Sequence, residues 1–183
     1  MTDIQVKVCV LGGGPAGYVA AIRAAQLGAS VALVERAELG GTCLNRGCIP
    51  TKALLRGAGV FDTVAHAGAF GVTVPAGAVT YDARAALARQ QAVVPALRAG
   101  LSQLMRKNGV TVCRGAGTVE APDRVRVEGD EPETEIRCGR LILAAGSAPL
   151  VPPIPGSDSP GVLTSDDALR TAEVPARVVV VGG

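Results

Sequence analysis

The apolar residues of this chain come in short runs that glycines interrupt, a pattern typical of buried strands joined to helices by tight turns. Val6–Leu11 is one such run, and it leads into glycines 12–14 and then into an alanine-rich stretch of helical periodicity that closes on Gly28. A second apolar run, Ser30–Glu35, ends on an acidic residue. The strand, helix and strand together span about 30 residues and predict a βαβ unit.

Two longer segments predict helices. Residues 42–69 have mostly helical character and are followed by Gly71. A second helix is predicted from Asp82, which suits the N-cap, to Asn108, with Gly109 as its C-terminal stop. Pro95 lies inside this helix and should kink it. Apolar residues recur on it at helical spacing and predict a packing face without chemistry of its own: Leu87, Val94, Leu97, Leu101 and Leu104.

Short alternating segments in the second half of the chain predict strands. The turn sequences PD and GDEP separate three of them, which suits a small antiparallel meander. A proline-rich connector, 148–161, follows the next buried strand, and a short helix is predicted from Ser165. The predicted strands of this half are 110–113, 118–120, 124–128, 135–137, 141–144 and 177–181.

These elements predict an α/β fold of Rossmann-like character, with a parallel sheet, long helices and a small antiparallel β-meander. We expect a first domain at residues 1–150 and a connector at 151–174. Residues 175–183 repeat the order of the N-terminus, an apolar strand followed by glycines, and are expected to open a second nucleotide-binding domain.

Composition narrows the class of protein. Hydrophobic residues make up 48% of the chain and aromatic residues 2%, so the interior must be built from small aliphatic side chains in close contact. The net charge of +2 carries no long basic run, which argues against nucleic acid and against a membrane surface as partners. The N-terminus, with Asp3 and few apolar residues before the glycines, is neither a secretory signal nor a spanning helix, and we expect a cytoplasmic protein.

The glycines after the first strand suit a phosphate. Gly12 permits a tight turn, Gly14 lets a pyrophosphate approach the backbone, and Gly17 allows helix and strand to pack closely. Pro15 costs little at a helix start, where its missing N–H would have no partner. Glu35, at the end of the next strand, can accept hydrogen bonds from ribose hydroxyls. The unit predicts binding of an adenine dinucleotide and leaves open whether this is FAD or NAD.

Two of the five cysteines lie close together in the sequence GGTCLNRGCIPTK. Positions as far apart as Cys43 and Cys48 do not meet in a regular helix, so a bridge between them requires a distorted turn, which Gly47 and Pro50 favour. A redox pair fits better than a metal site, because no second cysteine pair or histidine stands at ligand spacing. We therefore predict no metal, and we interpret His66 as a residue of a helix surface.

The remaining cysteines and one lysine have simpler interpretations. Cys9, Cys113 and Cys138 stand singly inside apolar strands and are predicted to be structural. Lys52 lies four residues after Cys48, on the same helical face, where a cation can lower the pKa of a thiol. The residues alone fit equally well with an ordinary solvated lysine.

Taken together, the glycine fingerprint, Glu35, GGTCLNRGCIPTKALL and LILAAGSAP resemble the N-terminal part of the flavin disulfide reductases. This family includes dihydrolipoyl dehydrogenase, glutathione reductase and mercuric reductase. CLN and CIPTKALL are most similar to the dihydrolipoyl dehydrogenase branch. The likeness runs over all 183 residues, and its cysteine stretch is highly specific.

The resemblance implies FAD on the first βαβ unit and a redox-active Cys43–Cys48 disulfide. Cys48 matches the cysteine beside the flavin, with which its thiolate forms a charge-transfer pair, and Cys43 matches the interchange thiol. Alanine at position 145 replaces a commoner threonine. The implied FAD contacts are Gly12, Gly14, Pro15, Ala16 and Gly17 at the pyrophosphate, Glu35 at the ribose, Arg36, Gly41 and Thr42 along the cofactor, Lys52 at the flavin edge, Gly117 near the adenine, and Ala145, Gly146 and Ser147 in a turn that closes over it.

The family mechanism implies electron flow from dihydrolipoamide through the disulfide and FAD to NAD⁺. The implied partners are dihydrolipoamide or the lipoyl domain of a 2-oxoacid dehydrogenase or glycine cleavage complex, and a second copy of the chain in a homodimer. The NAD domain, the dimer-interface domain and the catalytic base of the partner subunit are expected beyond residue 183. We therefore expect residues 1–183 alone to have little or no turnover.

Three other functions stay open at this stage. A reductase for glutathione, mercury or another disulfide would share every motif found here. A flavin-binding thiol module would form the Cys43–Cys48 bridge reversibly without turnover. A simple nucleotide-binding module would carry the cysteine pair by chance.

Overall fold

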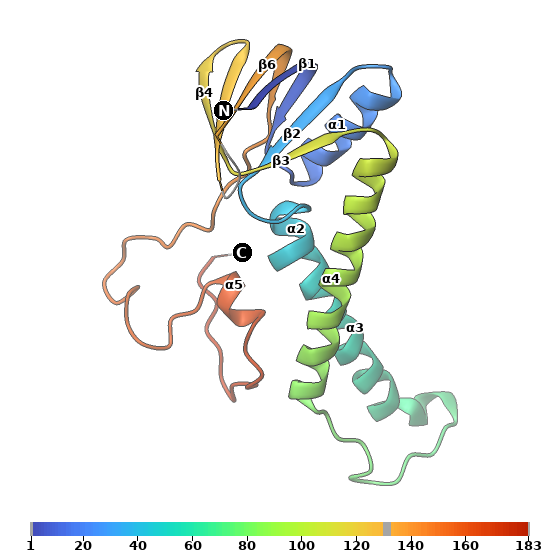
Figure 1. Cartoon of the computed structure of the whole chain (residues 1–183). Coiled ribbons are helices and arrows are strands. Elements are labelled where there is room, and N and C mark those ends of the chain that lie inside the picture. The colour runs from blue at the N-terminus through green and yellow to red at the C-terminus, as the bar shows by residue number, and fades with distance from the viewer. Residues whose placement is uncertain (1, 130–132, 183) are drawn as a thin grey trace.

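The computed structural model describes residues 2–129 and 133–182 and confirms the α/β class (Figure 1). Strands and helices alternate through the first half of the chain, and strands dominate the middle. The elements are β1 (Thr2–Leu11), α1 (Pro15–Gln26), β2 (Val31–Glu35), α2 (Gly41–Arg46), α3 (Cys48–Ala65), the 3₁₀-helix η1 (Ala67–Phe70), α4 (Ala83–Lys107), β3 (Thr111–Arg114), β4 (Ala116–Ala121), β5 (Arg124–Glu128), β6 (Thr134–Leu143) and α5 (Ser165–Ala168).

The six strands form one sheet in the order β3-β2-β1-β6-β5-β4. β3, β2, β1 and β6 run parallel, while β5 and β4 add an antiparallel end, which is the predicted meander. One prediction was wrong: the strands predicted at 135–137 and 141–144 are parts of a single strand, β6, which ends at Leu143. This strand pairs with β1 on one side and with β5 on the other, so the meander continues the parallel sheet. Residues 130–132 of the predicted GDEP turn lie outside the described residues.

Each face of the sheet carries its own apolar cluster. On one face, α1 and the C-terminal half of α4 cover β1 and β2, with Val10, Leu33 and Met105 among the buried residues. The second cluster, on the opposite face of the sheet (the second face), joins β1 and β2 to Val125 and Val127 of β5. The sheet thus supplies a rigid support, and the loops after its parallel strands are held at one edge.

The two long helices α3 and α4 pack along each other and extend away from the sheet (Figure 1). Asp82 caps α4 as predicted, because its Oδ1 accepts a hydrogen bond of 3.0 Å from the Ala85 N–H. The helix continues through Pro95, and Gly109, at φ 69°, follows its end. The C-terminal half of α4 thereby reaches the sheet, while its middle lies beside α2 and α3.

The C-terminal part of the chain is largely irregular. Residues 144–163 contain neither helix nor strand, and α5 is a single turn closed by a capping box between Thr164 and Asp167. The strand predicted at 177–181 is absent from this structure. Val178–Val181 are 67% to 89% exposed, and no strand of the described chain pairs with them. An extended segment becomes a strand only where a neighbour satisfies its backbone groups.

None of the helices within the described residues is long and apolar enough to cross a membrane.

Candidate dinucleotide and dithiol site

The glycine turn after β1 is shaped by two glycines that have no room for a side chain. Gly12 has φ 108°, and a Cβ there would overlap the carbonyl oxygen of Ala144. A Cβ on Gly17 would overlap the carbonyl oxygen of Gly12, so α1 can pack this close to the turn only through glycine. The predicted roles of Gly12 in the tight turn and of Gly17 in close packing are both confirmed by this geometry.

Gly14 lies where the glycine turn meets the loop that follows β2. It is the residue before α1, and a Cβ built on it would have Gly41 Cα as its nearest neighbour, at 3.8 Å. The space beside Gly14 is therefore open enough for a ligand to approach the backbone. The N–H groups of the first turn of α1, among them those of Ala16 and Gly17, have no partner earlier in the helix and suit an anion.

Glu35 is held beside the glycine turn by two backbone donors. Its Oε2 accepts a hydrogen bond of 2.7 Å from the Gly13 N–H, and its Oε1 accepts one of 2.8 Å from the Ala37 N–H. Each carboxylate oxygen retains a further lone pair, so the side chain can still accept from a ribose hydroxyl. The Gly13 contact was not predicted, although the middle glycine of GGG was a signal for it.

The loop after β2 is clamped against the glycine turn. Gly40 and Gly41 have φ 100° and 56°, and the Gly40 N–H donates a hydrogen bond of 2.9 Å to the Gly13 carbonyl oxygen. A Cβ on Gly41 would lie 2.6 Å from Gly14 Cα, which is too close for any side chain. Gly41 and Thr42 therefore begin α2 directly beside the candidate pyrophosphate position, and α2 carries Cys43.

The two candidate redox cysteines lie on either side of a break between two helices. Cys43 is in α2, and Cys48 is the first residue of α3. Gly47 separates them with φ −140° and ψ −106°, and a Cβ there would lie 3.0 Å from the Thr42 carbonyl oxygen. Pro50 is buried in the first turn of α3. The predicted distorted turn is thus present, and Gly47 is its centre.

The break brings the two thiols into contact. The hydrogen bond with the Cys48 thiol is the largest cause that raises the pKa of Cys43, followed by desolvation and by the charge of Cys48. The positive charge of Lys52 acts in the opposite direction and lowers the pKa of Cys43. Cys48 is exposed and Cys43 is half-buried, so a small dithiol or disulfide can reach the pair from solvent. Lys52 is therefore close enough to influence the pair.

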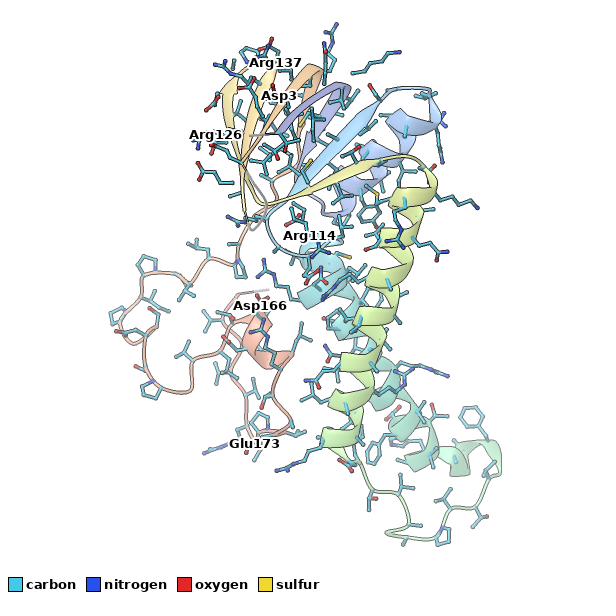
Figure 2. The ribbon with its side chains drawn as sticks, viewed as in Figure 1. Asp3, Arg114, Arg126, Arg137, Asp166 and Glu173 are labelled. Atoms are coloured by element: carbon cyan, nitrogen blue, oxygen red, sulfur yellow. The ribbon has the colours of Figure 1, made fainter. Side chains whose placement is uncertain are left out.

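Side chains of α2 tie the dithiol to other parts of the molecule. The Asn45 amide bonds to the loop before α2 and to Arg98 of α4, contacts that the sequence gave no reason to predict. Arg46, between the two cysteines, forms an ion pair of 3.6 Å with Asp166 of α5. Figure 2 shows Asp166 on the side of α5 that faces α2. The region 38–48 is thus contacted from the glycine turn, α4 and α5.

The other candidate cofactor residues lie at the same edge of the sheet or above its second face. Ala145, Gly146 and Ser147 follow β6, whose end is joined to that of β1 by a 2.8 Å hydrogen bond from the Ala144 N–H to the Leu11 carbonyl oxygen. Arg36 is exposed directly after β2. Gly117 of β4 lies over the second face, where a Cβ would overlap Leu11 and would lie 3.1 Å from Val34 Cγ1. Packing alone is enough to require glycine there.

The three remaining cysteines lie in the second apolar cluster, as the prediction of a structural role requires. Cys9 is 0% exposed, and desolvation, followed by the charges of Cys138 and Cys113, raises its pKa to about 12. Desolvation is also the main cause that raises the pKa values of Cys113 and Cys138. Among residues 2–129 and 133–182, no group of three His, Cys, Asp or Glu side chains is arranged to hold a metal ion.

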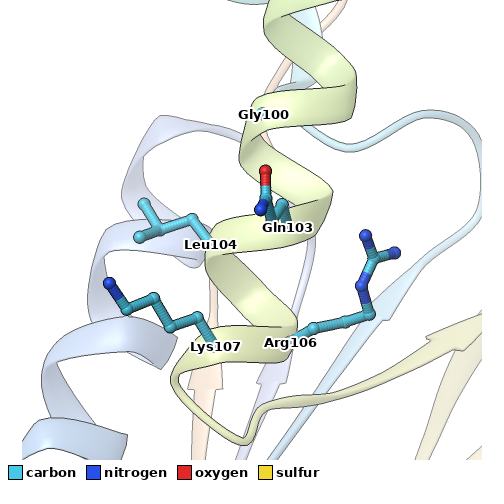
Figure 3. A pocket seen from close by; sticks show the side chains of 5 residues that line it. All are labelled: Gly100, Gln103, Leu104, Arg106 and Lys107. Carbon is cyan, nitrogen blue, oxygen red and sulfur yellow. The ribbon is translucent and has the colours of Figure 1, made fainter.

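A hollow elsewhere on the surface is unrelated to this site. Its lining comes from a single helix, α4, and Figure 3 shows the side chains of Gln103, Leu104, Arg106 and Lys107 around it. It contains none of the predicted site residues.

Known proteins are similar to this chain in sequence and in fold. The family model described as pyridine nucleotide-disulphide oxidoreductase matches residues 6–183. The dihydrolipoyl dehydrogenase of Bacillus subtilis (strain 168) is 42% identical over 178 residues, which cover 97% of this chain and 39% of that protein. The dihydrolipoyl dehydrogenase of Acholeplasma laidlawii is 43% identical over 183 residues, which cover 98% of this chain and 53% of that protein.

A solved structure extends the comparison to the fold. The Cu(II) complex of RclA, an HOCl-induced flavoprotein disulfide reductase from Escherichia coli, superimposes with a TM-score of 0.75 at 30% identity, over 93% of this chain and 35% of that one. The chain therefore spans about two fifths to one half of the length of the curated relatives described above.

Proposed function

Because the chain belongs to the pyridine nucleotide-disulphide oxidoreductase family, we propose that it binds FAD and exchanges electrons through a Cys43–Cys48 disulfide. In this proposal, residues 1–150 form the FAD-binding domain, residues 151–174 a connector, and residues 175–183 the opening of a domain that binds NAD. The observation that carries it is the contact between two accessible thiols at a helix break beside the dinucleotide turn.

The residues at the sheet edge fit FAD. Gly12, Gly14 and Gly17 leave the backbone of the turn open to a pyrophosphate, with Pro15 and Ala16 in the first turn of α1. Glu35 presents a carboxylate beside that turn for a ribose, and its negative charge disfavours a 2′-phosphate. Arg36, Gly41 and Thr42 are proposed to contact the cofactor between that turn and the dithiol, and Lys52, Gly117 and residues 145–147 complete the proposed set.

The reaction assigned to the dithiol is thiol–disulfide exchange. One thiolate of dihydrolipoamide attacks the Cys43 sulfur of the oxidised pair, and Cys48 leaves as a thiolate. The second thiol of the substrate, once deprotonated, attacks its own sulfur in the mixed disulfide and releases Cys43. The substrate leaves as a cyclic disulfide, and the protein gains two electrons as a dithiol.

The surroundings of the pair favour this order of attack. Cys48 heads α3, and the start of a helix favours a negative charge, so Cys48 is assigned as the leaving sulfur and Cys43 as the sulfur under attack. Lys52 adds a positive charge one turn further along the same helix. Bound FAD would supply a two-electron acceptor for the dithiol and a donor for NAD⁺, and the residues that would hold it are those of the glycine turn, Glu35 and the loop before α2.

The parent enzyme is proposed to be dihydrolipoyl dehydrogenase-like. Its partners would be dihydrolipoamide or the lipoyl domain of a 2-oxoacid dehydrogenase or glycine cleavage complex, together with a second copy of the chain. This assignment is supported by relatives such as the dihydrolipoyl dehydrogenase of Bacillus subtilis, at 42% identity. A cytoplasmic location and a role in cell redox homeostasis are part of the same proposal.

The test is a comparison of substrates on the FAD-loaded full-length protein. NADH oxidation is measured with lipoamide and with glutathione disulfide as alternative electron acceptors. We expect kcat/KM for lipoamide to be at least tenfold higher than kcat/KM for glutathione disulfide. Faster reduction of glutathione disulfide would assign the protein to another reductase, and a reversible bridge with no turnover of either acceptor would assign it to a thiol module.

A further inference from the structure

Asn45 lies between the two redox cysteines but faces away from them, into the loop that precedes α2. Its Nδ2 donates to the carbonyl oxygens of Glu38, Leu39 and Gly41, at 3.3, 3.0 and 2.9 Å. An amide nitrogen carries two protons, so it shares them among three acceptors. Gly41 is the first residue of α2, whereas Glu38 and Leu39 belong to the loop before it, which pairs with no strand of the described chain. The Asn45 amide therefore supplies donors to loop carbonyls that a neighbouring strand would otherwise bond.

Arg98 of α4 fixes the orientation of this amide. Its Nε donates a hydrogen bond of 3.0 Å to Asn45 Oδ1, and its Nη1 forms an ion pair of 3.1 Å with Glu38 Oε1. An asparagine amide that turns over has nearly the same shape but exchanges its donor for its acceptor. A donor held on Oδ1 makes the amide present its N–H groups to the loop. The guanidinium is the side chain that can hold both contacts in one rigid plane.

The loop held in this way connects the two halves of the site. The Gly40 N–H donates a hydrogen bond to the Gly13 carbonyl oxygen, which attaches the loop to the glycine turn. The loop continues into α2, a helix of six residues whose N-cap, Gly40, has no side chain with which to cap it. So short a helix does not fix its own position. The contacts through Asn45 add to the Gly40–Gly13 hydrogen bond and tie α2, which carries Cys43, to the loop that follows the glycine turn.

We propose that Arg98, acting through Asn45, is a positioning residue that sets the place of the dithiol relative to the dinucleotide turn. The proposal rests on the function proposed above, and it adds a residue of another helix, α4, that lies 53 positions from Asn45 in the sequence. Loss of the guanidinium frees the amide to turn over. The loop 38–41 then loses its fixed course, and with it the alignment of Cys43 against Cys48.

The experiment measures two properties of the full-length protein that do not depend on turnover. One is the Kd for FAD. The other is the glutathione ratio at which half of the flavin-free protein carries the Cys43–Cys48 bridge, by the balanced exchange in which two glutathiones and the bridge give glutathione disulfide and two protein thiols. Alkylation of free thiols and peptide mapping report the bridge. Urea unfolding shows whether each variant is folded.

Three variants and one control separate the possibilities. Arg98→Gln is expected to raise the Kd for FAD about tenfold, the effect of losing a charged hydrogen bond, and to shift the glutathione midpoint by at least threefold. Arg98→Lys keeps the charge but not the rigid two-point contact, and we expect it to fall short of wild type in both properties. Arg106→Gln, at an exposed position of the same helix (Figure 3), should stay within twofold of wild type.

Asn45→Asp provides a second route if Arg98→Gln does not fold. It retains a partner for Arg98 but turns the donors toward three carbonyls into acceptors, and the same two losses are expected. The proposal is overturned if Arg98→Gln or Asn45→Asp folds and behaves like Arg106→Gln, or if Arg98→Lys equals wild type. A wild-type protein that binds no FAD and forms no bridge would instead defeat the proposed function.

Discussion

The five cysteines of this chain fall into two groups that differ in their place relative to the sheet and in their surroundings. Cys43 and Cys48 lie on helices at the edge of the sheet, within reach of solvent and of each other. Cys9, Cys113 and Cys138 lie on strands, in or against the apolar cluster of the second face. We infer that location relative to the sheet, and not proximity between sulfurs alone, distinguishes the proposed redox pair from the three cysteines of the apolar cluster.

The electrostatic contrast follows from burial. The pKa of Cys9 is about 12, so the thiolate fraction at neutral pH is on the order of one in 10⁵, against a few per cent for an ordinary cysteine. The second face therefore holds three thiols in their protonated form as small apolar side chains. Within the described residues, the helix break at Gly47 is where two accessible thiols meet.

The largest expected effect comes from removing one member of the accessible pair. Cys48→Ser should lower turnover of the full-length enzyme by at least about 10³-fold, because no intramolecular thiolate remains to leave or to return. Cys113→Ser, a change in the other group, should retain most of the activity. Steady-state kinetics with lipoamide and NADH measures both, and an active Cys48→Ser variant would end the redox interpretation of the pair.

The converse experiment asks what the buried group does for stability. Cys9→Ser places a hydroxyl among Val34, Val125 and Ile136, with the Cys138 sulfur as a weak hydrogen-bond partner. This change should lower the free energy of unfolding by about 1–3 kcal/mol. Cys48→Ser, at an exposed position, should change it by less than about 0.5 kcal/mol. Urea titrations measure the free energy of unfolding of both variants, and the comparison holds where their m-values are equal. Equal stability of both variants would contradict the assignment of Cys9 to the core.

The glycine between the cysteines gives a smaller effect. Gly47→Ala brings a methyl group 3.0 Å from the Thr42 carbonyl oxygen and should destabilise the break by about 1–2 kcal/mol, with slower formation of the Cys43–Cys48 bridge. Gly59→Ala in the same helix meets nothing within 4 Å and should stabilise it by about 0.5–1 kcal/mol. Thermal unfolding and the rate of bridge formation after addition of glutathione disulfide distinguish them.

The smallest effect concerns the charge beside the pair. In the reduced protein the contact with Cys48 raises the pKa of Cys43, so its reactivity with iodoacetamide should appear only as the pH rises through that raised value. Lys52→Gln removes a charge that lowers the pKa, and alkylation of Cys43 near pH 8 should slow by roughly twofold, since Lys52 is exposed and screened. Lys107→Gln, on α4, serves as the control and should leave the rate unchanged.

Local sequence was sufficient for much of this picture. The βαβ unit, the cap at Asp82 and the break at Gly47 depend on residues that are close together in the chain, and each is present. Gly12 and Gly17 could be assigned to close contacts because that turn has few geometric solutions.

Features that depend on distant residues could not be predicted in this way. Strict alternation would place Val6 and Cys9 on opposite faces, yet both lie at the second cluster. The Ser30 carbonyl oxygen accepts from the N–H groups of both Lys7 and Val8, at 3.1 Å each, and this irregularity shifts the alternation. The contact between Asn45 and Arg98 likewise joins residues that only the packing of α2 against α4 brings together.

The most direct test of the central claim is a redox titration with mapping of all five cysteines. The full-length protein is equilibrated over a range of glutathione ratios, its free thiols are alkylated under denaturing conditions, and the peptides are identified by mass. We predict one reversible bridge, between Cys43 and Cys48, with Cys9, Cys113 and Cys138 alkylated at every ratio. A reversible bridge that includes any of those three, or the absence of a bridge between Cys43 and Cys48, would contradict the account.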